Sequence, residues 1–191
     1  VGPMRDKPAM DPVLQAFTGF MMDNVGHDDI PHRCTTIIND MSTALYAFQA
    51  VAPALHAKRD TARGRFIDVS LMRGAANLSA IRIMMASHRE LQKSVGAPPS
   101  GIHKTSDGWL QLVIIKDSDF HLLCDLLGLE HLKNDDSLLG LPARLERGDS
   151  LRAPFSEILL TKPAVYWRDM FTESGLQNEV LHEFGEFLEH P

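Results

Sequence analysis

The sequence predicts a mixed α/β chain in two parts, an α/β region over residues 1–95 and a small α+β region over residues 96–191. Three observations support this prediction. A long helical pattern follows Asp40, an alternation of apolar and polar residues occupies positions 66–71, and a hairpin pattern with an Asp-Gly turn spans positions 102–115. Helical periodicity and strand alternation in one chain are typical of mixed folds.

The first region opens with a helix and a loop. Positions 11–22 carry apolar residues on one broad face at helical spacing, which predicts a helix, and the polar positions 24–33 predict a loop. The short run 34–38 is β-branched and favours an extended chain. Asp40 then stands where the N-cap of the long helix belongs, because aspartate side chains accept hydrogen bonds from the free N–H groups of a first turn.

The long helix is predicted to bury one apolar stripe. Leu45, Phe48 and Leu55 recur at helical spacing, so we expect them in the core. Pro53 lies inside the same pattern and is expected to kink the helix, because proline removes one backbone hydrogen bond. The alternating run 66–71 predicts a strand, and positions 72–93 predict a further helix.

The second region begins at a segment of small residues and prolines, positions 94–101, which is the best internal boundary. Beyond it, positions 102–105 and 109–115 predict two strands of a hairpin. Asp107 and Gly108 lie between them, and Asp-Gly favours the positive φ angles of a tight turn. Further helices are expected at 117–127, 141–160, 164–174 and 179–189.

The composition excludes several classes of protein. The chain has 191 residues, of which 44% are hydrophobic and 23% charged, as in ordinary globular proteins. A net charge of −6 argues against a general nucleic-acid binder. No window holds the roughly 20 consecutive apolar residues that a membrane span needs. Cys34 and Cys124 lie far apart in the sequence, which favours a reducing compartment, and we expect a cytoplasmic protein.

Local chemistry alone leaves the candidate functional residues open. An aspartate in the position of Asp40 is more often a helix cap than a nucleophile. The segment from Gly96 to Gly101 serves either as a flexible linker or as a lid over a ligand. The loop 24–33 holds four potential metal ligands, but nothing enforces a ligand geometry, so no metal site is predicted. These four are His27, Asp28, Asp29 and His32.

Several segments, in one order along the chain, match motifs of a known family. They are positions 11–19, 38–47, 62–71, 101–109 and 147–175. The first is similar to D-x-x-x-Q-A-x-S-G, the second to D-x-x-x-G-x-x-A, and the third to G-x-G-x-x-V-D-V-S-L. Over nearly its whole length the chain therefore resembles the family III CoA-transferases. Members of this family include formyl-CoA and carnitine CoA-transferases and also α-methylacyl-CoA racemase.

The resemblance implies a fold and an assembly. Residues 1–95 would be part of a large nucleotide-fold domain, and residues 96–191 would be the small α+β domain. The family's full chain is much longer, and much of its CoA-binding surface lies in an N-terminal half that is missing here. The chain starts at Val1 and ends at Pro191 directly after a helical pattern, so we expect an internal fragment. Full-length members form interlocked homodimers.

The resemblance also implies roles for particular residues. Asp40 would be the catalytic carboxylate, which takes CoA from an acyl-CoA donor, forms an aspartyl-CoA thioester and passes CoA to a small carboxylic acid. Gln15 and Tyr46 would face the active site. The segment from Gly96 to Gly101 would close over the acyl-CoA. The only cofactor expected is the CoA thioester itself, which is a substrate, and no metal is expected.

Two alternatives stay open at the level of sequence. In a racemase or epimerase, Asp40 would act as a general base with a histidine as its partner, for which His27 or His32 is available. In the other alternative, the chain is an inactive, truncated member of the family. The sequence also departs from the family pattern, with Ala44 where many members have glycine and with a proline-containing segment at 96–101 in place of a glycine-rich loop.

Overall fold

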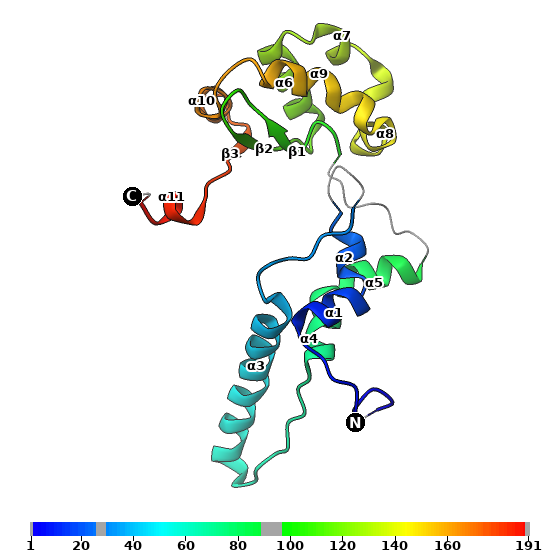
Figure 1. Ribbon diagram of the computed structural model, residues 1–191, viewed down its shortest axis with the longest axis vertical. Helices are drawn as coiled ribbons and strands as arrows, with labels where there is room; N and C mark the ends of the chain where they lie inside the picture. The colour runs from blue at the N-terminus through cyan, green and yellow to red at the C-terminus, as the bar shows by residue number, and fades with distance from the viewer. Residues whose placement is uncertain (1, 26–29, 89–96, 190–191) are drawn as a thin grey trace. The chain divides into compact units, whose positions relative to one another are not determined.

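The computed structural model describes residues 2–25, 30–88 and 97–189 (Figure 1). The chain divides into two compact units, Val1–Ser94 and Val95–Pro191. The chain as a whole is a mixed α/β protein that is mostly helical and contains one small three-stranded antiparallel sheet. This confirms the predicted fold class.

The first unit is helical over its described residues. Its helices are α1 (Asp11–Phe17), α2 (Phe20–Asp23), α3 (Ile38–Thr61), α4 (Leu71–Leu78) and α5 (Ala80–Ser87). Gly19 separates α1 from α2 with a φ of 83°, a value that glycine adopts without strain. Ser70 begins α4 as its N-cap, because its hydroxyl oxygen accepts the backbone N–H of Arg73 at 3.3 Å.

The strand predicted over 66–71 is wrong. Positions 62–70 run without regular secondary structure, and Leu71 already belongs to α4. The run 34–38 forms no strand either, and its last residue begins α3. An alternating pattern becomes a strand only where another strand pairs with its backbone. None of the described residues of this unit offers such a partner, apart from a single bridge between Val25 and Pro31.

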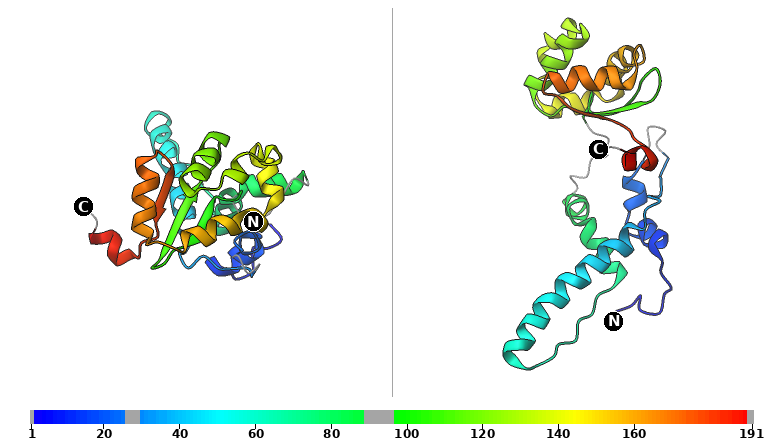
Figure 2. Two further views of the ribbon diagram at one scale, coloured as in Figure 1. Left: turned by 90° about the horizontal axis from the view of Figure 1, so that it is seen from above. Right: turned by 90° about the vertical axis from the view of Figure 1, so that its left-hand side faces the viewer.

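The long helix α3 continues through Pro53, and Figure 2 shows it as one uninterrupted helix. The predicted burial of its apolar stripe is wrong. Leu45, Phe48 and Leu55 are exposed, Phe48 to 71%. Helical periodicity shows which residues share a face, and burial of that face requires a neighbour that the described part of the unit does not supply.

The packing partner of α3 is α4, and the two helices meet at a glycine. A Cβ atom built on Gly74 would lie 1.9 Å from Oγ1 of Thr43 and 3.2 Å from its Cα. Gly74 is buried, and so is the Thr43 hydroxyl, which has no hydrogen-bond partner among the described residues. This position accepts only glycine because the two helices approach so closely.

The second unit has a three-stranded sheet covered by helices. The strands are β1 (Gly101–Lys104), β2 (Trp109–Val113) and β3 (Gln177–Val180), in the order β1-β2-β3, and both pairs are antiparallel. The predicted hairpin of β1 and β2 is confirmed, but its loop spans residues 105–108, and neither Asp107 nor Gly108 has the positive φ expected of a tight Asp-Gly turn. The helices are α6 (Asp117–Leu127), α7 (Glu130–Lys133), α8 (Leu141–Arg147), α9 (Asp149–Leu159), α10 (Ala164–Glu173) and α11 (Phe184–Glu189). A single 3₁₀ turn, η1 (Asp136–Leu138), precedes α8.

Two helix predictions in this unit need correction. The pattern over 141–160 forms two helices, because Gly148 adopts a φ of 52° and ψ of −137°, which breaks the helical backbone. The pattern over 179–189 is a helix only in its second half. Its first residues belong to β3, where Val180 pairs with Leu110 of β2. Pairing with an existing hairpin outweighs the local helical pattern there. The helices predicted at 117–127 and 164–174 are confirmed as α6 and α10.

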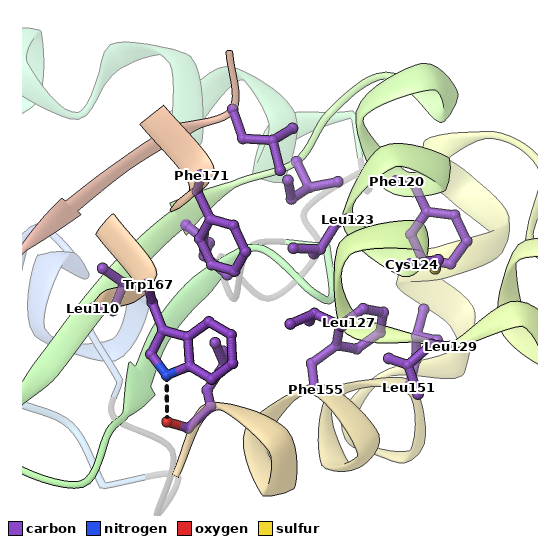
Figure 3. Close-up of a cluster of buried hydrophobic side chains, with 14 of the residues drawn as sticks. Leu110, Phe120, Leu123, Cys124, Leu127, Leu129, Leu151, Phe155, Trp167 and Phe171 are labelled. Atoms are coloured by element: carbon purple, nitrogen blue, oxygen red, sulfur yellow. Dashed lines mark hydrogen bonds between the residues drawn. The ribbon is translucent and has the colours of Figure 1, made fainter. Parts of the chain in front are cut away.

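The helices and the sheet of the second unit enclose a hydrophobic core (Figure 3). Leu110 and Leu112 of β2, Phe120 and Leu123 of α6 and Phe155 of α9 are all at most 1% exposed. Other members of this core are Ile114, Cys124, Leu127, Leu129, Leu138, Leu151, Leu159, Trp167, Phe171 and Leu176. Figure 3 also shows the one polar contact drawn in this core, in which the indole N–H of Trp167 donates to the Leu159 carbonyl at 2.9 Å.

Candidate active site

Asp40 lies in the first turn of α3, where its carboxylate is half-buried. The helix begins at Ile38, so Asp40 is inside it, and the prediction that Asp40 is the N-cap is wrong. The capping contact comes from α1 instead, because Oδ1 of Asp11 accepts the backbone N–H of Asn39 at 2.8 Å. No hydrogen bond or ion pair joins the Asp40 carboxylate to any residue that the structure describes. This carboxylate is therefore available to an outside reaction partner.

A buried polar network holds the backbone next to Asp40. Asp11 is 3% exposed, and its Oδ2 accepts the side-chain amide of Gln15 at 2.5 Å. Gln15 also donates to the Cys34 carbonyl at 3.1 Å and accepts the Cys34 N–H at 3.0 Å. Asn39 returns a hydrogen bond from its Nδ2 to the Asp11 carbonyl at 3.3 Å. These contacts tie α1 and the chain at Cys34 to the first turn of α3.

The two predicted ligand contacts near Asp40 differ in their surroundings. Gln15 is fully buried, and both ends of its amide are bonded within the network. Tyr46 is half-buried on α3. Six residues along a helix turn the chain by about 600°, so Tyr46 points roughly 120° away from the face that carries Asp40. Contact of either residue with a ligand stays a prediction.

The predicted lid falls partly outside the described chain. Gly96 is not among the described residues, and its role stays a prediction. Residues 97–99 are buried, with a cis peptide bond between Pro98 and Pro99, and Ser100 is half-buried. Ser100 bonds to β2 in both directions, because its Oγ donates to the Ile114 carbonyl at 2.9 Å and accepts the Ile114 N–H at 2.7 Å. Residues 97–100 therefore belong to the packed body of the second unit.

Two buried basic side chains, Arg152 and His103, also bind residues 97–102 to the second unit. Arg152 of α9 donates to the carbonyls of Ser100 at 2.9 Å and Ile102 at 3.3 Å. Burial lowers the pKa of Arg152, and Asp149, at 3.9 Å, opposes that shift only partly. Gly101 has a φ of 121°, and a Cβ there would lie 2.8 Å from Nη2 of Arg152. The positive φ therefore favours glycine at position 101, the nearby guanidinium group adds to this preference, and contact of Gly101 with a ligand stays a prediction.

His103 holds the same segment from the other side. Its ring is 1% exposed and lies between the Pro99 carbonyl, 2.7 Å from Nε2, and Oγ of Ser156, 3.0 Å from Nδ1. With the proton on Nε2, the ring donates to Pro99 and accepts from the Ser156 hydroxyl. Arg152 and His103 come from an adjacent helix and strand, and they fix the segment through backbone carbonyls.

An open cavity of about 490 Å³ lies beside α1 in the first unit. Its apolar walls include Val13, Phe17 and Leu71, and three cationic residues line it, namely Arg5, Lys7 and Arg73. Two of these cations have carboxylate partners outside the lining, since Arg5 lies 3.2 Å from Asp6 and Arg73 lies 3.6 Å from Asp68. Such a cavity suits a ligand that combines an apolar arm with negative charge. The wall also includes Ala9, which lies shortly before Asp11 and its contact with the turn of Asp40.

The remaining candidates give no further site. His27, Asp28 and Asp29 lie outside the described residues, and His32 is exposed, with its backbone N–H donating to the Asn24 carbonyl at 2.9 Å. The residues described by the structure contain no group of three or more potential metal ligands. Within the same described ranges, no helix is long and apolar enough to cross a membrane.

Comparison with known proteins identifies the family. The whole chain, residues 1–191, matches the family described as CoA-transferase family III. The chain belongs to this family. It is 28% identical, over its full length, to acetyl-CoA:oxalate CoA-transferase of Acetobacter aceti, and 26% identical, over 92% of its length, to succinyl-CoA:glutarate CoA-transferase of Mus musculus. The match covers 51% of the first relative and 42% of the second, so the chain spans about half the length of these family III proteins.

A solved structure shows the same fold. The crystal structure of Rv3272 from Mycobacterium tuberculosis superposes with a TM-score of 0.86 at 23% sequence identity. The superposition covers all of this chain and 51% of that structure. That structure therefore shows the same fold as this chain, and the family match confirms the resemblance seen in the sequence motifs.

The sequence singled out Gln15, but it did not predict the contacts that hold the site together. Asp11 and Gln15 are four residues apart on one helix, a spacing at which side chains meet, so their contact was predictable. Their contacts with Asn39 and Cys34 join segments that are distant in the sequence, and no local sequence pattern predicts these contacts. The same holds for Arg152, which reaches a loop some fifty positions earlier in the chain.

Proposed function

We propose that this chain carries the nucleophile of a CoA-transferase, and that Asp40 is that nucleophile. The observation that supports the proposal is the Asp40 carboxylate itself, half-exposed and unbonded within the described chain, in the first turn of a 24-residue helix of a family III protein. A nucleophilic carboxylate must be ionised and open to its substrate. The N-terminus of a helix favours the ionised form, because the helix dipole places partial positive charge there.

The proposed reaction exchanges CoA between two acids. A carboxylate oxygen of Asp40 attacks the thioester carbonyl of an acyl-CoA, the C–S bond breaks, and CoA leaves as a thiolate. The thiolate attacks the Asp40 carbonyl of the resulting mixed anhydride, which releases the donor acid and leaves an aspartyl-CoA thioester. The acceptor acid then reverses both steps, takes up CoA and restores the Asp40 carboxylate.

The names of the relatives support the substrate class. They are transferases of acetyl-CoA and oxalate and of succinyl-CoA and glutarate, so each joins an acyl-CoA to a carboxylic acid. The cavity beside α1 supports CoA as a ligand of this chain. Its apolar walls fit a pantetheine arm, and Arg5, Lys7 and Arg73 supply charge for phosphate groups. The acceptor is proposed as a small carboxylic acid, and no metal takes part in the proposed steps.

Full transferase activity involves more than the residues of this chain. Because the chain spans about half of its relatives, full activity is proposed together with the region those relatives have in addition. A homodimer and a cytoplasmic location stay predictions. The alternative, an inactive truncated member of the family, predicts that Asp40 never reacts. The following experiment distinguishes this alternative from the proposed function.

The test is chemical trapping of the proposed intermediate. The chain is incubated with acetyl-CoA or succinyl-CoA and then with hydroxylamine, which converts an activated aspartyl group to a hydroxamate, and peptides are analysed by mass spectrometry. We expect the hydroxamate on Asp40 and its loss in Asp40→Asn. Asp60→Asn is the matched control, because Asp60 lies exposed near the other end of α3. An absence of modification at Asp40, or modification that persists elsewhere in Asp40→Asn, would overturn the proposal.

A further inference from the structure

A buried carboxylate lies beside the proposed nucleophile, and the reaction does not use it. Asp11 is 3% exposed, and none of the described residues forms an ion pair with it. It lies at the first position of α1 and at the same time bonds to the first turn of α3. An unpaired buried charge is costly unless the surrounding groups stabilise it. Here the N-terminal turn of α3 does so, because it directs the backbone N–H of Asn39 and the positive end of its dipole toward the carboxylate.

We propose that Asp11 is a positioning residue for Asp40. This inference rests on the proposed function of Asp40 and deepens it. The two oxygens of Asp11 accept from two different donors, the Asn39 N–H at 2.8 Å and the Gln15 side-chain amide at 2.5 Å. Asn39 immediately precedes Asp40, so Asp11 fixes the peptide from which the nucleophile projects.

The network has a fixed direction. The Cys34 N–H donates to Oε1 of Gln15, so the amide of Gln15 must turn its nitrogen toward the Cys34 carbonyl and Asp11. Asp11 consequently faces two donors and must offer two acceptors. A carboxylate offers both, whereas an asparagine offers one acceptor and one donor. In Asp11→Asn, an N–H group replaces one carboxylate oxygen, so a donor of the new asparagine faces a donor of Gln15 or Asn39.

The turn is also held from its far side, and the nucleophile is left free. The Ser42 hydroxyl donates to the Asn39 carbonyl at 3.1 Å, and Asn39 returns its Nδ2 to the Asp11 carbonyl at 3.3 Å. The backbone before Asp40 is thus bonded through its N–H, its carbonyl and its side chain. The side-chain carboxylate of Asp40 has no bonded partner among the described residues. A rigid support with an unengaged nucleophile is the arrangement that a preorganised site needs.

The test exchanges the amide and the carboxylate between Asp11 and Gln15. Asp11→Asn disrupts the network, and Gln15→Glu disrupts it by placing two carboxylates against each other. In the double variant Asp11→Asn with Gln15→Glu, the introduced asparagine amide donates to the introduced glutamate carboxylate, the Asn39 N–H keeps its acceptor, and the Cys34 N–H keeps its own. The bond to the Cys34 carbonyl is lost, and a glutamate oxygen then faces that carbonyl oxygen with no proton between them. The double variant is therefore expected to recover part of what either single variant loses.

The first measurement is amide hydrogen exchange, which does not depend on activity. In Asp11→Asn we expect exchange at residues 39–41 to be about 10- to 100-fold faster, the range for loss of a hydrogen bond to a charged acceptor. The double variant is expected to restore slow exchange in part, and Asp60→Asn is expected to leave it unchanged. The inference is overturned if Asp11→Asn matches Asp60→Asn, or if exchange rises equally along α1, α3 and α4, which would show general loss of stability.

The second measurement is the yield of hydroxamate on Asp40 after exposure to acyl-CoA. We expect the yield to fall in both single variants and to recover in part in the double variant, in parallel with hydrogen exchange. Failure of the proposed function looks different, because then the unaltered chain shows no modification at Asp40. If the unaltered chain reacts and Asp11→Asn reacts equally fast, the nucleophile stands and the positioning role of Asp11 is overturned.

Discussion

The two units bury different kinds of side chain. In the second unit, fifteen buried residues form one hydrophobic cluster between the sheet and its helices. In the first unit, the fully buried side chains that the structure describes are mostly polar, and Asp11, Gln15 and Asn39 are among them. The large apolar side chains of the first unit, such as Phe48 and Ile81, are exposed to 71% and 75%.

This difference separates a unit with a closed hydrophobic core from the unit that carries the proposed nucleophile. Burial of apolar surface is the main source of folding free energy, and the second unit has a closed core that supplies it. The first unit uses its buried positions for a hydrogen-bond network around the turn of Asp40. Buried polar groups that are fully bonded specify one geometry while they add little net stability. The first unit is therefore precise at its site and weakly stabilised elsewhere.

The largest expected effect comes from equal truncations in the two units. Phe155→Ala removes a side chain that is 0% exposed in the core of the second unit, and Phe48→Ala removes one that is 71% exposed. We expect the free energy of unfolding of the second unit to fall by about 3–5 kcal/mol for Phe155→Ala, because a cavity remains in the core. For Phe48→Ala we expect a change within about 0.5 kcal/mol.

Urea unfolding followed by a probe in each unit measures both values. Trp109 and Trp167 report on the second unit, and amide hydrogen exchange along α3 at each urea concentration reports on the first. Equal losses for the two phenylalanine variants would contradict the comparison, because they would mean that Phe48 is covered in solution.

The second prediction concerns the closest packing in the first unit. Gly74→Ala places a Cβ 1.9 Å from Oγ1 of Thr43, so α3 and α4 must separate or shift. We expect the first unit to lose about 1–3 kcal/mol, the usual cost of overpacking. Gly64→Ala is the matched control, because no atom lies within 4 Å of its new Cβ and its φ is not positive.

Amide exchange along α3 and α4 measures this loss without disturbance from the second unit. Thr43→Ala removes the hydroxyl that meets the new methyl group, so the pair Gly74→Ala with Thr43→Ala is expected to be less destabilised than Gly74→Ala alone. If Gly74→Ala and Gly64→Ala behave alike, α3 and α4 do not pack this closely in solution.

The sequence predicted the second unit better than the first. Strand alternation on either side of Asp107 and Gly108 and helical periodicity are local signals, and they placed the hairpin of β1 and β2 and the helices α6 and α10 correctly. In the first unit the same kind of signal placed a strand at 66–71 and a buried stripe on α3, and both were wrong. Alternation and amphipathicity show that one face of an element is apolar. They do not show that the described chain contains a segment that packs against this face.

The candidate site was predictable only in part. Motif order placed Asp40 near a helix start, and the structure puts it in the first turn. Its supports, Asp11 and Asn39, are distant in the sequence, and their contact requires α1 and α3 to meet. The attachment of residues 97–100 by Arg152 and His103 was likewise not predictable from the sequence. A segment of small residues and prolines has the composition of a linker, whether or not other side chains bind it.

The smallest expected effect contrasts the two cysteines. Cys124 lies in the core of the second unit, and burial, followed by the nearby carboxylates Asp125 and Glu130, raises its pKa from 9.0 to about 12. Cys34 lies half-buried in the first unit, with both its backbone groups bonded to Gln15. We expect a thiol reagent at neutral pH to modify Cys34 in the folded chain and Cys124 only after unfolding, because the thiolate is the reactive form.

The raised pKa also predicts a pH dependence with a definite sign. Between pH 9 and about 12 the unfolded chain releases the Cys124 proton while the folded chain retains it. The unfolded state then binds fewer protons, so the stability of the second unit falls as the pH rises through this window and is unaffected below it. Cys124→Ala removes this contribution, and urea titrations at about pH 8 and about pH 10 should show a smaller decrease for the variant. An identical decrease in the unaltered chain and in Cys124→Ala would mean that the Cys124 thiol is in contact with solvent. The core of the second unit would then not be closed, and the two units would not differ in this way.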